Sequence, residues 1–200
     1  MSWIKTIAYK EAELPLKKLY DQVSGPDGSI DNVLKIHGLR PHTLRGHLGL
    51  YKSVLHHKNN MLPLWYLEAI GVFVSHLNHC NYCVDHHLTR IQRLKSVESA
   101  ERLMRAIIEE CLKDYFSPKE ISGLEYSRTL TLEIQQLSEK DVQQMKSAGY
   151  DDGEILEINQ VVSYFNYVNR TVLGLGVSTK GDILGLSPKQ NSNIDDWEHH

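Results

Sequence analysis

A pair of cysteines with nearby acid–base side chains lies near the middle of the chain. Cys80 and Cys83 are separated by two residues. His87 follows the second cysteine by one helical turn, and Glu68 precedes the first by twelve positions. A thiolate can attack a peroxide to give a sulfenic acid, which a second thiol converts to a disulfide, and an imidazole oriented by a carboxylate can move the protons. We therefore predict a redox-active site within residues 68–87.

The same residues also fit two structural interpretations. Cys80 and Cys83 lie on an apolar helical stripe with Ile91, which is typical of unreactive core thiols. His87 would then be a core histidine, and Glu68 would be one half of an interhelical salt bridge, for example with Arg90.

Zinc binding is a further alternative. His76, Cys80, Cys83 and His87 share one face if the segment is helical. The two histidines would then lie about 16 Å apart along the axis, whereas zinc ligands lie within about 2.3 Å of one ion. All four therefore cannot bind one ion, and a zinc ion shared across an oligomer interface stays open.

Other polar residues are assigned no chemistry. Three histidines are expected to be solvated or to lie in turns: His76, His79 and His86. Cys111 is expected in the core, in the middle of a helix. Asn169 and Arg170 are expected to cap a helix end or to pair across a subunit interface.

Composition excludes several classes of protein. A net charge of −3 gives no reason to expect nucleic acid or an anionic membrane as a partner, and no window approaches the roughly 20 apolar residues of a membrane span. The first 20 residues lack the apolar core of a secretory signal, and three cysteines are too few for a disulfide scaffold. We expect a cytoplasmic protein with a single domain over residues 1–200, whose core covers about 30–178.

Helical patterns account for most of the chain, and no segment has a convincing strand pattern, so an all-α fold is predicted. Ser117, Ser138 and Asp151 each begin a capping box. The N-terminal arm and the tail beyond Gly174 lie outside the helical core, and the tail is expected to be an extended arm or disordered. The helices are expected at 11–24, 41–57, 63–77, 80–95 and 96–112, and after each capping box.

A hairpin of helices is needed to bring the site together. In one straight helix Glu68 and Cys80 would be about 18 Å apart. Residues 78–81 are poor helix formers, so we predict a sharp turn at 78–79 that places Glu68 beside His87. Gly71 and Ser75 share the face of Glu68, and their small size would let another helix approach closely. The same turn places the cysteine pair at a helix N-terminus, where the dipole favours a thiolate.

This pattern resembles the AhpD-like alkylhydroperoxidases of the carboxymuconolactone decarboxylase superfamily, and in particular their "peroxidase-related" branch. The residues that carry the resemblance are Glu68, Ser75, Asn78, Cys80, Tyr82, Cys83 and His87, with a later match at 165–170 and 173–174. The resemblance covers roughly residues 30–178. Tyr82 is a departure, because the best-known AhpD type has a histidine between its cysteines.

The resemblance implies an AhpD-like helical bundle that assembles as a homo-oligomer, either a trimer, a hexamer or a related form. It implies reduction of hydroperoxides without a cofactor, with recharging by a dithiol reductant such as a lipoylated protein. Cys83 would form the sulfenic acid, Cys80 would be the proton donor and resolving thiol, and Glu68 and His87 would form the proton relay. Position at the helix start alone favours Cys80 as the nucleophile.

The resulting hypothesis is a cysteine peroxidase or thiol–disulfide oxidoreductase with catalytic residues Glu68, Cys80, Cys83 and His87 and no bound metal. Two alternatives remain open. One is a carboxymuconolactone-type decarboxylase, which needs no cysteine pair. The other is a non-enzymatic redox- or zinc-sensing module.

Overall fold

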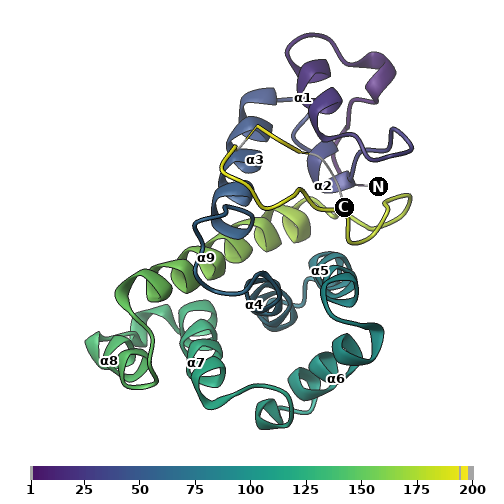
Figure 1. The fold of residues 1–200 in the computed structure, drawn as a ribbon. Helices are drawn as coiled ribbons and strands as arrows, with labels where there is room; N and C mark the ends of the chain where they lie inside the picture. Colours follow the sequence, from purple (N-terminus) through teal and green to yellow (C-terminus); the bar gives the residue numbers. More distant parts are fainter. Residues whose placement is uncertain (1, 194, 198–200) are drawn as a thin grey trace.

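The computed structural model describes residues 2–193 and 195–197, and over these residues it is helical, as predicted (Figure 1). The only β-type pairing among them is an isolated bridge between His57 and Asn191. No helix in these ranges has both the length and the apolarity that crossing a membrane requires. The helices are α1 (Leu16–Val23), α2 (Asn32–Lys35), α3 (Pro41–Leu55), α4 (Leu64–Leu77), α5 (Asn81–Leu94), α6 (Val97–Ile108), α7 (Pro118–Leu132), α8 (Glu139–Ser147) and α9 (Asp152–Gly174), with 3₁₀ turns at Tyr9–Glu11, Leu112–Asp114 and Ile134–Gln136.

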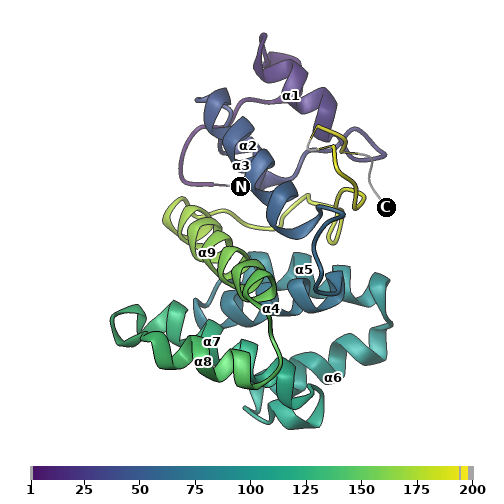
Figure 2. The ribbon, with the colours of Figure 1, turned by 60° about the vertical axis from the view of Figure 1, so that its left-hand side comes forward.

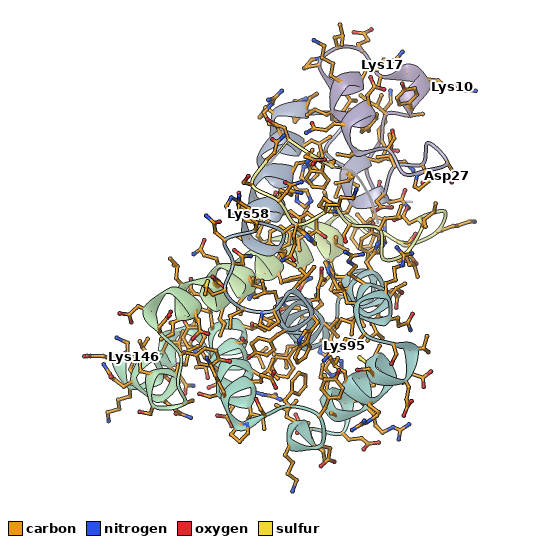
Figure 3. All side chains as sticks on the ribbon, viewed as in Figure 1. Lys10, Lys17, Asp27, Lys58, Lys95 and Lys146 are labelled. Carbon is orange, nitrogen blue, oxygen red and sulfur yellow. The ribbon has the colours of Figure 1, made fainter. Side chains whose placement is uncertain are left out.

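Helix α4 is the centre of the molecule. Every residue from 66 to 75 is buried, because this helix is apolar on nearly all sides and must be surrounded by others. It packs against α5, α7 and α9. Lys10, Lys17, Lys58 and Lys146, by contrast, lie at the periphery of the molecule (Figure 3).

Helix α9 approaches α4 closely at the small residues that the sequence placed beside Glu68. A Cβ atom on Gly71 would lie 2.2 Å from the ring of Phe165 on α9, so only glycine fits there. One turn later Asn169 on α9 donates a hydrogen bond to Ser75 Oγ at 3.1 Å. The predicted close approach on this face is therefore confirmed.

Capping explains where the later helices begin. Ser117, Ser138 and Asp151 each form the predicted reciprocal capping box, with Glu120, Asp141 and Glu154 respectively. Each box satisfies two backbone N–H groups that lack intrahelical partners, and loss of such a cap costs about 1 kcal/mol.

Two predicted helices were too long. The first begins only at Leu16, because Pro15 lacks an N–H donor and disfavours helical backbone in the residue before it. The helix after Ser96 ends at Ile108, where Glu110 takes a left-handed backbone (φ 55°) and the N–H of Cys111 bonds back to Ala106. The expectation of a mid-helix core position for Cys111 was wrong, since this residue is half-buried in a loop.

The two ends of the chain pack together on one side of α9 and α5, while α6, α7 and α8 lie on the other (Figures 1 and 2). A second hydrophobic cluster joins α1 and α3 to Trp197. The described tail after Gly174 is an arm without helix, and its residues Ser187 and Trp197 are buried, so the disordered alternative was wrong for this part. His199 and His200, which would fit a remnant of a purification tag, lie outside the described residues.

Candidate active site

The predicted turn joins α4 to α5 as an antiparallel hairpin. His79 adopts a left-handed backbone (φ 57°), and the N–H of Cys80 donates to the carbonyl of Ser75 at 2.8 Å. Cys80 is therefore the N-cap of α5, and Cys83 lies in its first turn. The hairpin and the position of the cysteine pair are as predicted.

The hairpin brings Glu68 and His87 into contact. Glu68 Oε2 lies 2.6 Å from His87 Nδ1, in a site where the carboxylate has no solvent exposure. Burial raises the pKa of Glu68, but the charge and hydrogen bond of His87, assisted by His56 and Arg90, outweigh burial and hold that pKa below its usual value. Glu68 is thus an anion that orients the imidazole one turn after Cys83.

A second histidine, His56, faces the other oxygen of Glu68. Its Nε2 lies 3.8 Å from Glu68 Oε1, beyond hydrogen-bond distance, and the residue is fully buried. Burial lowers the pKa of His56 to about 3, although the Glu68 charge acts in the opposite direction. No sequence pattern predicted a role for His56, because it lies at the end of another helix and no spacing links it to the cysteines.

The pKa values of the two thiols are shifted in opposite directions. The Cys83 thiol donates a hydrogen bond to Cys80, and this bond, with the N–H of Cys83, lowers the pKa of Cys80 despite burial. The same bond and burial raise the pKa of Cys83 well above its ordinary value. The thiolate of the pair is therefore stabilised on Cys80, at the N-terminus of α5, where unpaired N–H groups favour negative charge.

Asn169 completes the environment of the dithiol. Its side chain forms hydrogen bonds to both cysteines that lower their pKa values, and it is positioned by Ser75 and by Asn78, whose Nδ2 donates to Asn169 Oδ1 at 3.0 Å. No chemistry had been assigned to Asn169, yet it touches the reactive atoms. The useful sequence signal was a fully apolar helix face interrupted by one amide.

A cavity of about 70 Å³ opens onto Cys83 and His87, but its lining does not include Cys80 or Glu68. The remaining walls are a mixture of aromatic, aliphatic and polar side chains from α2 and the residue before it, α3, α5, α9 and the tail. Substrate entering this cavity would therefore meet Cys83 rather than Cys80. The other lining residues are Asp31, Val33, Leu34, His47, Tyr51, Tyr82, His86, Arg90, Tyr164, Val168, Leu186, Ser187, Pro188 and Trp197.

One histidine expected to be solvated is buried instead. His86 is 9% exposed, and its ring lies 4.6 Å from that of Tyr82. His79 is exposed and His76 is half-buried, as befits turn and surface positions. Helical periodicity could have predicted that His86 is buried, because it lies close to the buried residues 82–84 and one turn before the buried Arg90.

Comparison with known proteins shows the fold. No protein-family model matches the chain. It is 26% identical over 109 residues to the uncharacterized protein YdfG of Bacillus subtilis (strain 168), which covers 54% of this chain and 72% of that one.

Solved structures give a wider match. An uncharacterized peroxidase-related protein from Ralstonia eutropha JMP134, described as an alkylhydroperoxidase AhpD core, superposes with a TM-score of 0.77 at 20% identity, over 90% of this chain and 93% of that one. The debrominase Bmp8 superposes with a TM-score of 0.70 at 17% identity, over 88% and 91% of the two chains. The predicted AhpD-like helical fold is thereby confirmed.

Proposed function

We propose that this protein is a cysteine-dependent peroxidase that reduces hydroperoxides through Cys80 and Cys83. The observation that carries the proposal is a buried dithiol whose second sulfur faces a cavity, one turn from an imidazole held by a buried carboxylate at 2.6 Å. Thiol, base and orienting acid are the groups that thiol-based peroxide reduction uses. The AhpD-like fold adds support, since a neighbour in that fold is described as peroxidase-related.

In the first step Cys83 attacks the terminal oxygen of the hydroperoxide. Its S–H proton passes along the existing hydrogen bond to the Cys80 thiolate as the new S–O bond forms and the O–O bond breaks. His87, in its protonated form, gives a proton to the departing alkoxide, which leaves as an alcohol. Glu68 stabilises the imidazolium before the transfer and orients the ring throughout.

In the second step the Cys80 thiol attacks the sulfur of the Cys83 sulfenic acid. The disulfide forms and water leaves with the proton of Cys80. The peroxide has gained two electrons, and the cysteine pair has lost two. Asn169, hydrogen-bonded to both sulfurs, keeps them in register for this attack.

A dithiol reductant must then reopen the disulfide by two thiol exchanges. Cys80 has no solvent exposure and Cys83 only 3%. A dithiol on a long flexible arm, as on a lipoylated protein, suits such a buried disulfide better than the surface of a folded reductant. Assembly as a homo-oligomer stays a prediction from the family resemblance.

The test is mass spectrometry of the reduced protein after limiting cumene hydroperoxide. A Cys80–Cys83 disulfide is expected, and dihydrolipoamide should sustain turnover. A sulfenic acid trapped on residue 83 in Cys80→Ser, with no trapping in Cys83→Ser, supports Cys83 as the nucleophile, and the reverse pattern would assign this role to Cys80. Cys111→Ser is the matched control and should keep full turnover.

Other outcomes would favour the alternatives. Lactone-acid decarboxylation that survives Cys83→Ser would indicate a decarboxylase and would overturn the proposal. If a folded, reduced protein forms no disulfide and shows no turnover with peroxide, the proposed peroxidase activity is wrong.

A further inference from the structure

Three ligand-type side chains from distant parts of the sequence meet beside the cavity. Asp31 precedes α2, His86 lies on α5, and Asp182 lies in the tail. One ligand atom from each lies within 4.8 Å of the other two. The convergence of α2, α5 and the tail is visible in the ribbon (Figure 1).

This cluster has a buried polar atom that lacks a hydrogen-bond partner. His86 is 9% exposed, and its Nε2 makes no hydrogen bond although it points at Asp182 Oδ2 from 3.5 Å. The Asp182 side chain has no solvent exposure at all. A buried imidazole nitrogen that is within ion-pair distance of a carboxylate but makes no hydrogen bond is costly, and an ion bound between these groups would remove that cost.

Hydrogen bonds from Tyr82 and Asn32 hold the Asp182 carboxylate in place. Tyr82 donates its hydroxyl to Asp182 Oδ2 at 2.6 Å, and the backbone N–H of Asn32 donates to both carboxylate oxygens at 3.1 Å. Outer hydrogen bonds of this kind orient the ligands of metal ions. A carboxylate has about four lone-pair positions, so these donors leave a site free toward His86.

We propose that Asp31, His86 and Asp182 bind Zn²⁺ or a similar divalent metal ion. One imidazole and two carboxylates suit Zn²⁺, Mn²⁺ or Fe²⁺, and two carboxylate charges balance the ion. Metal bonds of about 2.0–2.2 Å require ligand atoms about 3.3 Å apart, which small rotations of these side chains supply.

The site has two consequences for the molecule. Three protein ligands leave an open coordination position, and because Asp31 and His86 also line the cavity of Cys83, that position faces the substrate space. The ion would also join the segment before α2 and the tail to α5, which closes the cavity. This site contains no sulfur, so it differs from zinc binding by the cysteines and does not depend on peroxidase activity.

The experiment is a calorimetric titration of the chelator-treated, reduced full-length protein with Zn²⁺, and with Mn²⁺ and Mg²⁺ for comparison. The titration is repeated in the Cys80→Ser/Cys83→Ser double variant, which removes any thiolate site. One equivalent of Zn²⁺ should bind in that background, and cleavage of the tail by protease should slow when the ion is present.

Variants then assign the ligands. Asp182→Asn and His86→Gln should abolish binding. Tyr82→Phe removes the hydroxyl that donates to Asp182 and accepts from the N–H of Val33, so it should weaken binding about 10–100-fold. Asp85→Asn, an exposed aspartate beside His86, is the matched control and should bind as the unmutated chain does. Circular dichroism of each variant separates lost binding from lost folding.

Cobalt absorption gives a measurement that does not depend on any variant. Co²⁺ in the unmutated protein should show d–d bands without thiolate-to-metal charge transfer. The proposal is overturned if the unmutated chain binds no ion, if charge transfer appears and binding disappears with the cysteines, or if folded Asp182→Asn and His86→Gln both keep full affinity.

Discussion

His86 and His87 are neighbours in the chain, but they belong to two different sites. His87 points into the α4–α5 hairpin and bonds Glu68 at 2.6 Å, so its carboxylate partner is already engaged. His86 points toward the seam between α5 and the two chain ends, where Asp182 stands 3.5 Å away and no hydrogen bond forms. A rotation of about 100° per residue around one helix thus separates a closed acid–base pair from an open cluster.

The difference shows how each site depends on the rest of the molecule. The closed pair lies between two helices of the main core, so its geometry is as stable as the fold itself. The open cluster draws a ligand-type residue from each chain end, so it forms only when those ends are seated. A pair that is complete suits proton transfer, and a cluster that is incomplete suits an added ion.

The largest expected effect comes from breaking the closed pair. Glu68→Gln removes the charge that orients and stabilises the imidazolium of His87, so formation of the Cys80–Cys83 disulfide by peroxide should slow about 10²–10⁴-fold. Stopped-flow measurement with limiting peroxide checks this. Glu101→Gln, on the exposed face of α6, is the control. A folded Glu68→Gln protein with the unmutated rate would remove Glu68 from the mechanism.

The second prediction concerns His56, which faces the other oxygen of Glu68, and the dependence of protein stability on pH. Burial holds the pKa of His56 at about 3 in the folded protein, against an ordinary value of 6.5, so the protein has its full stability above pH 6.5, where His56 is neutral in both the folded and the unfolded chain. That stability is lost as pH falls below 6.5, by about 3 kcal/mol by about pH 4. Urea unfolding at several pH values should show this loss.

A variant identifies the source of the loss. His56→Gln should lose less stability over the same pH range, while His42→Gln, an exposed histidine on α3, should behave like the unmutated chain. His47, whose pKa burial also lowers to about 3, adds to the acid sensitivity that remains. Identical pH profiles for His56→Gln and the unmutated protein would contradict this assignment.

A packing change tests whether the position of the His87 ring depends on its contact with Phe165 as well as on its hydrogen bond to Glu68. Phe165 lies edge-on to His87 with centroids 4.7 Å apart, and Gly71 makes room for that ring. Gly71→Ala should destabilise the protein by about 1–3 kcal/mol by overpacking and should slow the peroxide reaction. Thermal unfolding and the disulfide assay measure both. Gly46→Ala, where a Cβ meets nothing within 4 Å, should be neutral or stabilising.

The smallest effect concerns the dithiol. Asn169→Ala removes a hydrogen bond that lowers the pKa of Cys80, so that pKa should rise and the thiolate should appear at higher pH. The reaction with peroxide should be about threefold slower at neutral pH, and its pH profile should move upward. The neighbouring exposed Arg170→Ala is the control. An unchanged profile would mean that Asn169 has only a packing role.

Much of the site could be predicted from local sequence. Spacing placed Cys80 at a helix start and Cys83 on its first turn, and poor helix formers at 78–79 predicted the turn that brings Glu68 to His87. Small residues at 71 and 75 predicted the close approach of another helix. These inferences hold because helix periodicity and capping act within a few residues and survive in any tertiary context.

Long-range contacts decided the rest. His56, Asn169 and Asp182 reach the two sites from segments more than ten residues away from them, and no local pattern specifies which helix covers which face. Local sequence patterns were sufficient to predict the all-helical fold, the turn and the dithiol with its acid–base pair. The packing of distant segments established that Cys83 rather than Cys80 faces a cavity, and that His86 is buried, because burial depends on how separate segments pack and not on the residues beside each position.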